Sequence, residues 1–144
     1  MPIKETAWKF FEACETGKGG EVCKQWCHDG ATFSCQAGAL ADVTNAADYA
    51  EWMKGILGPL PDGRYELKAF SADEKRNTVT AAAVFHGTHT GEGGPVPPTG
   101  KAAATDYVYV FAWWFYASWW EYVVSLDLRE QHRRRDGAHS LCCF

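Results

Sequence analysis

The stretch TVTAAAVFHGTHTGEGGPVPPTGKAAATDYVYVF, residues 78–111, decides the fold of this 144-residue chain. Its two ends, residues 78–85 and 102–111, are rich in the β-branched and aromatic residues typical of strands. Glycines and prolines fill the connection between them, and these residues respectively permit positive φ and restrict the chain. The pattern predicts two neighbouring strands joined by a long, shaped loop that carries two histidines. The plainer alternative is that the connection is a turn and nothing more.

The residues before this stretch have helical spacing. Residues 5–15 predict an amphipathic helix whose apolar positions include Ala7, Phe10, Phe11 and Cys14. A second, short helix is expected over residues 21–27, followed by a short strand over residues 31–36. Asn45 is typical of a helix N-cap, and it precedes a third helical segment over residues 46–57.

The periodicity changes after residue 64. Tyr65, Leu67 and Phe70 belong to a further strand candidate, and the polar residues 73–77 predict a turn into the strand at 78–86. Helices followed by consecutive strands indicate an α+β fold with helices packed on one face of a curved antiparallel sheet. Such a sheet can enclose an apolar pocket at one open end.

Composition limits the class of protein. A chain of this length with 47% hydrophobic residues fits one domain with a substantial core. The net charge of -4 argues against a nucleic-acid partner, and the basic cluster at residues 133–135 is best explained as a solvated tail. The first residues lack the apolar stretch of a secretory signal, so we expect a cytoplasmic protein with reduced cysteines.

No metal or cofactor is expected. Cys23 and Cys27 are four residues apart and His28 follows, so on a helix the two sulfurs would share a face. This spacing is not a standard zinc signature and no second pair lies at a suitable distance, which favours cysteines that pack in the core. The glycines at residues 91–94 lack the strand-to-helix context of a nucleotide-binding loop.

Residues 85–92 read FHGTHTGE and are followed by the turn PPTGK at residues 97–101. Residues 8–11 read WKFF, and residues 26–33 read WCHDGATF. Together these segments resemble the SnoaL-like polyketide cyclase family, within the nuclear transport factor two superfamily. The resemblance covers about the first three quarters of the chain. It implies a cone-shaped α+β barrel, with helices packed on a strongly bent and mostly antiparallel sheet.

The resemblance also implies how the chain is divided and what it binds. It implies a single domain over residues 1–128, followed at residues 129–144 by a basic, cysteine-ended tail that we expect to be disordered. Many members of the superfamily pair through the sheet, and a homodimer is expected here. The implied ligand is a small apolar or polycyclic molecule. The fold itself does not fix the reaction, because it hosts both enzymes and binding proteins.

The chain departs from the family after Val110. In the cyclases, an Asp that follows a Trp near the end of the sheet is the acid/base. This chain continues instead with an aromatic run, and its next carboxylate after Trp120 at a comparable place, Asp127, does not have the spacing from a Trp that the family has. A membrane span over residues 107–128 is disfavoured by its acidic residues. Two interpretations stay open. Residues 111–128 form a last strand that closes the pocket, or the reading frame changed near residue 111.

The chemistry that these residues allow is proton transfer next to a carbonyl. It needs a base and a group that stabilises the enolate, in a pocket that excludes water. His89 is the first candidate and His86 the second, because imidazoles titrate near neutral pH; side chains three apart on a strand face opposite sides, so one of them at most faces the pocket. Asp106 could orient an imidazole or act as base, or could lie at a strand edge in water.

Several aromatic residues are expected to form the pocket wall and contact the substrate: Trp8, Phe33, Trp52, Phe85, Tyr107 and Tyr109. Two classes of function remain. The first is a cofactor-independent cyclase or isomerase of the SnoaL-like type acting in an apolar pocket. The second is a non-catalytic ligand-binding or dimerisation module with the same fold, which the missing terminal acid favours.

Overall fold

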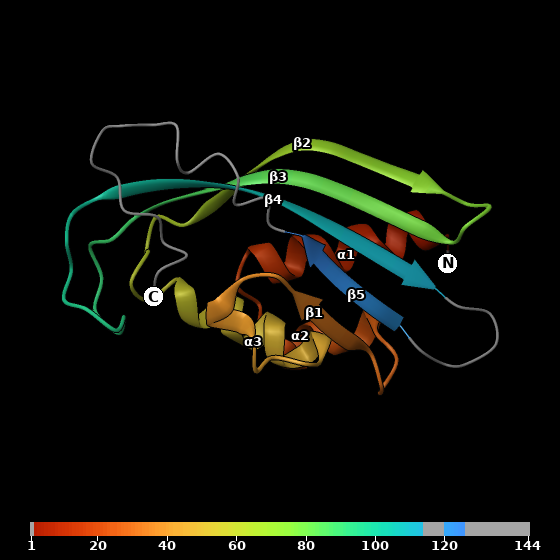
Figure 1. Ribbon diagram of the computed structural model, residues 1–144, viewed down its shortest axis with the longest axis horizontal. Coiled ribbons are helices and arrows are strands. Elements are labelled where there is room, and N and C mark those ends of the chain that lie inside the picture. Colours follow the sequence, from red (N-terminus) through yellow and green to blue (C-terminus); the bar gives the residue numbers. More distant parts are fainter. Residues whose placement is uncertain (1, 114–119, 126–144) are drawn as a thin grey trace.

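The computed structural model describes residues 2–113 and 120–125. A five-stranded sheet has the strand order β1-β5-β4-β3-β2, and the helices lie together against one of its faces (Figure 1). The strands are β1 (Thr32–Cys35), β2 (Arg64–Asp73), β3 (Thr78–Thr88), β4 (Ala102–Trp113) and β5 (Trp120–Ser125). Neighbouring strands are antiparallel except β1 and β5, which are parallel. The α+β class and the mostly antiparallel sheet expected from the sequence are confirmed.

The helices follow the expected order. They are α1 (Ile3–Glu15), α2 (Gly20–Cys23), the 3-10 turns η1 (Lys24–Trp26) and η2 (Gly38–Leu40), and α3 (Ala46–Ile56). The predicted cap of the third helix is confirmed, because the Asn45 side chain accepts a hydrogen bond of 2.8 Å from the backbone N–H of Asp48. The helix expected over residues 21–27 instead divides into α2 and the tighter turn η1.

The sheet curves over the helices, as the long strands β2, β3 and β4 in Figure 1 show. A bulge interrupts the β2–β3 register between Leu67 and Ala69, and such an extra residue bends and twists a strand. Buried and partly exposed residues alternate along the whole of β3. One face of the strand therefore packs on the helices, and the fold is the cone-like α+β fold that the sequence predicted.

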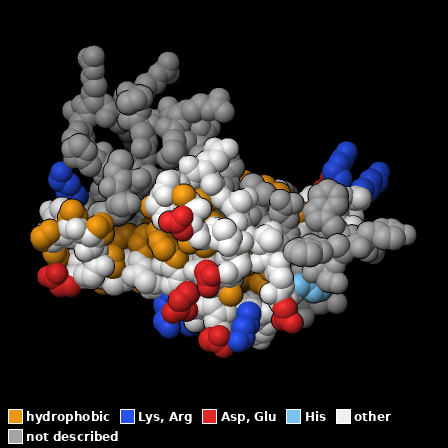
Figure 2. Space-filling view, turned by 60° about the horizontal axis from the view of Figure 1, so that its bottom comes forward, with side chains coloured by type: hydrophobic (Ala, Val, Ile, Leu, Met, Phe, Trp, Pro, Cys, Tyr) orange, Lys and Arg blue, Asp and Glu red, His pale blue; other side chains and the backbone are white. Residues whose placement is uncertain are grey.

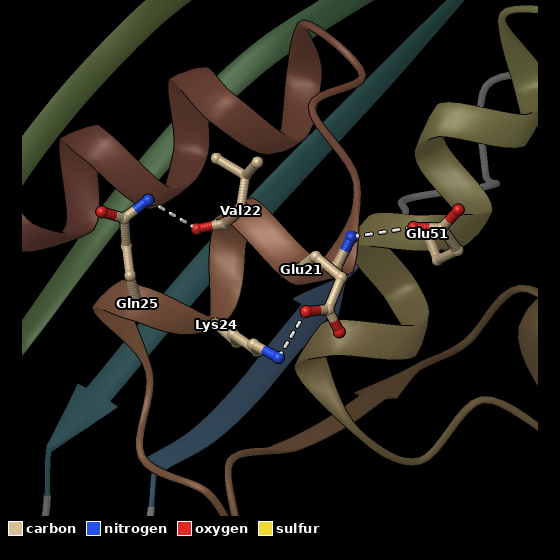
Figure 3. Close-up of polar contacts among 6 residues, drawn as sticks. Glu21, Val22, Lys24, Gln25 and Glu51 are labelled. Carbon is tan, nitrogen blue, oxygen red and sulfur yellow. Dashed lines mark hydrogen bonds and ion pairs between the residues drawn. The ribbon is translucent and has the colours of Figure 1, made fainter.

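α2 is fixed to α3 by its first residue. The backbone N–H of Gly20 donates a hydrogen bond of 3.0 Å to Oε2 of Glu51 (Figure 3). A Cβ at position 20 would lie 2.5 Å from the carbonyl oxygen of Ala47, so only glycine allows the two helices to approach this closely. This contact holds α3, one wall of the site described below, in place.

The backbone of residues 120–125 forms β5 between β4 and β1. A strand at this place agrees with the interpretation of the aromatic run as a last strand, and the reading-frame alternative stays a hypothesis. The tail predicted at residues 129–144 lies outside the described residues. Within residues 2–113 and 120–125, every helix is too short or too polar to cross a bilayer.

Candidate active site

A cavity of about 370 Å³ lies between the sheet, α3 and the loop that follows β3. Apolar residues dominate its wall, which includes Leu40, Trp52, Met53, Ile56, Leu60 and Phe85. Its polar side chains come mainly from α1 and β4, namely Glu15, Thr105, Tyr107 and Tyr109, with Tyr49 from α3. A pocket with apolar walls and a few converging polar groups is the usual form of a small-molecule site.

The cavity has a closed end and an open end. Glu15, Tyr49 and Tyr109 line the closed end and are almost inaccessible to solvent. The exposed wall residues mark the mouth, and they are Gly93 and Pro95 of the loop between β3 and β4, Ala39 of η2 and Gly55 of α3. Figure 2 shows hydrophobic side chains gathered toward the left of the view, at the end of the molecule where this loop lies.

A buried carboxyl group lies at the closed end. Glu15, the last residue of α1, is 2% exposed, and it accepts hydrogen bonds from the hydroxyls of two tyrosines of β4. The Tyr107 hydroxyl lies 2.5 Å from Oε2, and the Tyr109 hydroxyl donates to Oε1. Tyr49 lies 2.5 Å from the Tyr109 hydroxyl and donates to it, because Tyr109 has already given its one proton to Glu15.

The surroundings of Glu15 change its acidity. Burial raises the pKa of the Glu15 carboxyl from 4.5 to about 7, although the hydrogen bonds from Tyr107 and Tyr109 act in the opposite direction. Burial and the nearby Glu15 carboxylate raise the pKa of Tyr107 and also that of Tyr49. At neutral pH, Glu15 therefore has both protonation states accessible, while the tyrosines stay neutral hydrogen-bond donors.

The tyrosines are held by aromatic packing. Phe33 of β1 stacks on the Tyr49 ring, with centroids 4.2 Å apart and planes 10° from parallel. The Phe11 ring, on the inward side of α1, meets the Tyr109 ring edge-on at 5.3 Å. Because these rings come from different elements, the hydroxyls are positioned before any ligand enters.

His89 lies behind the cavity wall. Its side chain is 2% exposed, and its Nδ1 is hydrogen-bonded to the Thr99 hydroxyl at 3.2 Å. A Cβ on Gly94, a wall residue, would lie 3.3 Å from its Nε2. Backbone hydrogen bonds join His89 to Lys101 and to Gly100, at 2.9 and 2.8 Å. These contacts join the two ends of the loop over residues 89–101, so His89 lies where it can stabilise that loop.

His86 and Asp106 lie on the other side of the sheet from the cavity. His86 alternates with the buried Phe85 along β3, and its Nε2 is 3.0 Å from a carboxylate oxygen of Glu66 on β2. Asp106 is exposed and alternates with the buried Tyr107 along β4. The structure therefore does not bring His86, His89 and Asp106 together, and none of the three lines the cavity.

Four of the six residues predicted as pocket wall line the cavity, namely Trp52, Phe85, Tyr107 and Tyr109. The other two are placed elsewhere. Phe33 stacks on Tyr49, and Trp8, on α1, packs against Phe70 of β2 with ring centroids 5.3 Å apart.

Glu15 was missed by the sequence analysis. The signal was present, because Glu15 follows Phe11 by four residues and Ala7 by eight, which places it on the apolar face of α1. A carboxyl group on that face must be hydrogen-bonded or neutral once it is buried. Its partners on β4 are about 90 residues away along the chain, as the separation of 92 positions between Glu15 and Tyr107 shows.

The described residues include no group of three or more His, Cys, Asp or Glu side chains that could hold a metal ion. Cys14 and Cys23 are buried free thiols, and Cys27 is half-buried. Burial raises the pKa of the Cys27 thiol to about 12. Cys14 of α1 and Cys23 of α2 belong to the hydrophobic core, and Cys27 packs against it.

The comparisons with known proteins connect the chain to a fold. No family model matches the sequence, and no curated protein matches it either. Solved structures do match. AclR from Streptomyces galilaeus, a candidate hydroxylase, superimposes with a TM-score of 0.67 at 18% identity over 94% of this chain and 84% of its own.

Two further structures carry the cyclase name. IdmH from Streptomyces antibioticus, a candidate polyketide cyclase, gives a TM-score of 0.66 at 17% identity over 88% of this chain and 93% of its own. A SnoaL-like polyketide cyclase from Agrobacterium tumefaciens gives 0.62 at 12% identity over 92% and 97%. This chain therefore has the fold of the SnoaL-like polyketide cyclases.

Proposed function

We propose, on the premise of this SnoaL-like fold, that the chain is a cofactor-independent enzyme that transfers a proton next to a carbonyl group in a small apolar molecule. Glu15 is the acid/base in this proposal. The observation that carries it is a carboxyl group at the closed end of an apolar cavity, with a pKa of about 7 and two tyrosine hydroxyls aimed at it. A base is most effective when its pKa lies near the working pH.

The first step uses the ionised form of Glu15. The carboxylate takes a proton from the carbon next to the carbonyl, so the C–H bond breaks, an O–H bond forms on Glu15, and the electron pair moves to the carbonyl oxygen as an enolate. The neutral carboxyl group no longer requires two donors. A tyrosine hydroxyl, which can rotate about its C–O bond, then donates to the enolate oxygen, and we assign this role to Tyr107.

The second step returns the proton. In an isomerisation, Glu15 gives its proton to a different carbon of the enolate. In a cyclisation, the enolate carbon bonds to a second carbonyl carbon of the same molecule, and the alkoxide formed takes the proton from Glu15. The cyclase name of the structural neighbours favours the second course. The apolar wall would keep water away from the enolate in either case.

The test is hydrogen exchange at carbon. The bicyclic ketone 2-tetralone is incubated with the protein in deuterated buffer, and loss of its α-proton signals is followed by NMR. The wild type should accelerate exchange more as pH rises through about 7, because the carboxylate is the active form. Glu15→Gln, which keeps the shape but cannot take a proton, should lower the rate by about 100-fold or more.

Two variants serve as controls. Glu12→Gln removes a carboxylate one turn earlier on α1, where the side chain is exposed, and His86→Ala removes the imidazole on the outer face of the sheet. Both should exchange at the wild-type rate. Wild-type exchange in Glu15→Gln, or loss of exchange in His86→Ala, would show that Glu15 is not the base.

A specific observation supports the second candidate, a module that binds a ligand without turning it over. Both oxygens of the Glu15 carboxylate accept tyrosine hydrogen bonds in the free protein, so the carboxyl group already has partners without a substrate. Under this alternative, 2-tetralone binds in calorimetry but its α-protons exchange no faster than in buffer.

A further inference from the structure

Three polar side chains follow one another along the cavity side of β4. Thr105, Tyr107 and Tyr109 are spaced by two residues, which places all three on the same face of the strand. All three line the cavity. Thr105 is the nearest of them to the end of β4 that joins the loop over residues 89–101, and that loop forms part of the mouth. Thr105 therefore lies between the mouth and Glu15.

The Thr105 hydroxyl differs from the tyrosine hydroxyls of the cavity. Tyr107 and Tyr109 donate to Glu15, and Tyr49 donates to Tyr109. Among residues 2–113 and 120–125, none forms a hydrogen bond with the side chain of Thr105. Its opposite neighbour on β3 is Phe85, another wall residue. The Thr105 side chain is half-buried and lies beside an apolar part of the wall.

A hydroxyl in apolar surroundings is costly unless it finds a hydrogen-bond partner. Thr105 lines the cavity and is half-buried, so a molecule that covers it there has to offer its hydroxyl a hydrogen-bond partner. The cavity-lining residues in the described part of the chain include no lysine, arginine or histidine, so a negatively charged partner would be left without a counter-ion near Glu15. The partner that fits is a neutral oxygen of a bound molecule.

We infer that Thr105 is a specificity-determining residue that hydrogen-bonds a second, neutral oxygen of the bound molecule. The inference rests on the proposed function for the other end of that molecule, where the first oxygen belongs to the carbonyl group beside Glu15. The ligand class is a neutral, apolar ring compound with two oxygens, one at the closed end and one, a hydroxyl or second carbonyl, on the mouth side.

The test compares ligands that differ in one oxygen. Calorimetry measures the dissociation constants of 2-tetralone and of its 6-hydroxy and 7-hydroxy derivatives with the wild type, Thr105→Val and Thr105→Ser. The wild type should bind at least one hydroxy derivative about three- to tenfold more tightly than 2-tetralone, which is the range expected for one hydrogen bond. Thr105→Val should bring this ratio to about one, while Thr105→Ser should keep it.

Two further measurements separate a ligand-binding role from a structural one. Thr80→Val makes the same change on the outer face of β3 and should leave the ratio at the wild-type value. Thr105→Val should also keep the wild-type midpoint of urea unfolding, because the hydroxyl makes no bond that the fold needs. A lowered midpoint would mean that Thr105 serves the fold, and it would overturn the inference.

An unchanged ratio in Thr105→Val would also overturn it, and so would a wild type that binds none of the three compounds. Hydrogen exchange on 2-tetralone reports separately on the proposed function. If the ratio falls in Thr105→Val but the wild type shows no exchange, the binding role of Thr105 stands and the proposed catalysis fails. If exchange occurs and the ratio is unchanged, only the inference about Thr105 fails.

Discussion

Glu15→Gln should change how the stability of the protein depends on pH. In the folded chain the pKa of Glu15 is about 7, against an ordinary value of 4.5. The native state therefore holds this proton more tightly than the unfolded state does. Protonated Glu15 favours the fold fully below about pH 4.5, and this contribution is lost as pH rises to about 7. Glutamine cannot ionise, so the variant lacks this loss.

The size of the effect follows from the gap between the two pKa values. Each pKa unit corresponds to about 1.36 kcal/mol, so the gap amounts to about 3 kcal/mol for a group that is 2% exposed. Glu15→Gln should thus gain about 3 kcal/mol relative to the wild type between pH 4 and pH 8. The free energy of unfolding of a domain is typically about 5–15 kcal/mol, so this change is a large share of it.

Urea unfolding followed by tryptophan fluorescence measures this difference. With a denaturant slope of about 2 kcal/mol per molar, the midpoint of the variant should move by about 1.5 M relative to the wild type across this pH range. Glu12→Gln is the matched control, since it removes an exposed carboxylate from the same helix. Parallel pH profiles for the wild type and Glu15→Gln would refute the raised pKa, and with it the basis for Glu15 as base.

Two further predictions concern the loop at the mouth. His89→Ala should lower the free energy of unfolding by about 1–3 kcal/mol, because it removes a buried ring that is hydrogen-bonded to Thr99. His86 is partly exposed, and His86→Ala should change the free energy of unfolding by about 0.5 kcal/mol or less. Equal urea midpoints for the two variants would show that His89 does not stabilise the loop. Gly91→Ala should cost about 1–3 kcal/mol, because its Cβ would lie 1.9 Å from the carbonyl oxygen of Gly58. Gly30→Ala, whose Cβ meets nothing within 4 Å, is its control in thermal unfolding, and similar melting temperatures would contradict the close contact.

The elements of this fold could be predicted because their signals are local. Asn45 caps α3 through the Asp48 backbone three residues on, and alternation along β3 predicts which of its residues face the helices. The same alternation predicts that at most one of His86 and His89 faces the cavity, and neither of them lines it. It could not place His89, because β3 ends at Thr88 and the ring packs against residues of a loop without regular structure.

The sequence by itself determined the class of fold, the helical face that carries Glu15 and the strand face that carries Thr105, Tyr107 and Tyr109, because these depend on the periods of helix and strand. Only the tertiary structure decided that these faces meet around one cavity. The carboxyl group of Glu15 and the hydroxyl of Tyr109 are 94 positions apart, and no local pattern records such a contact. The raised pKa is a product of the same packing, since burial, and not the identity of the residue, makes the charged form costly.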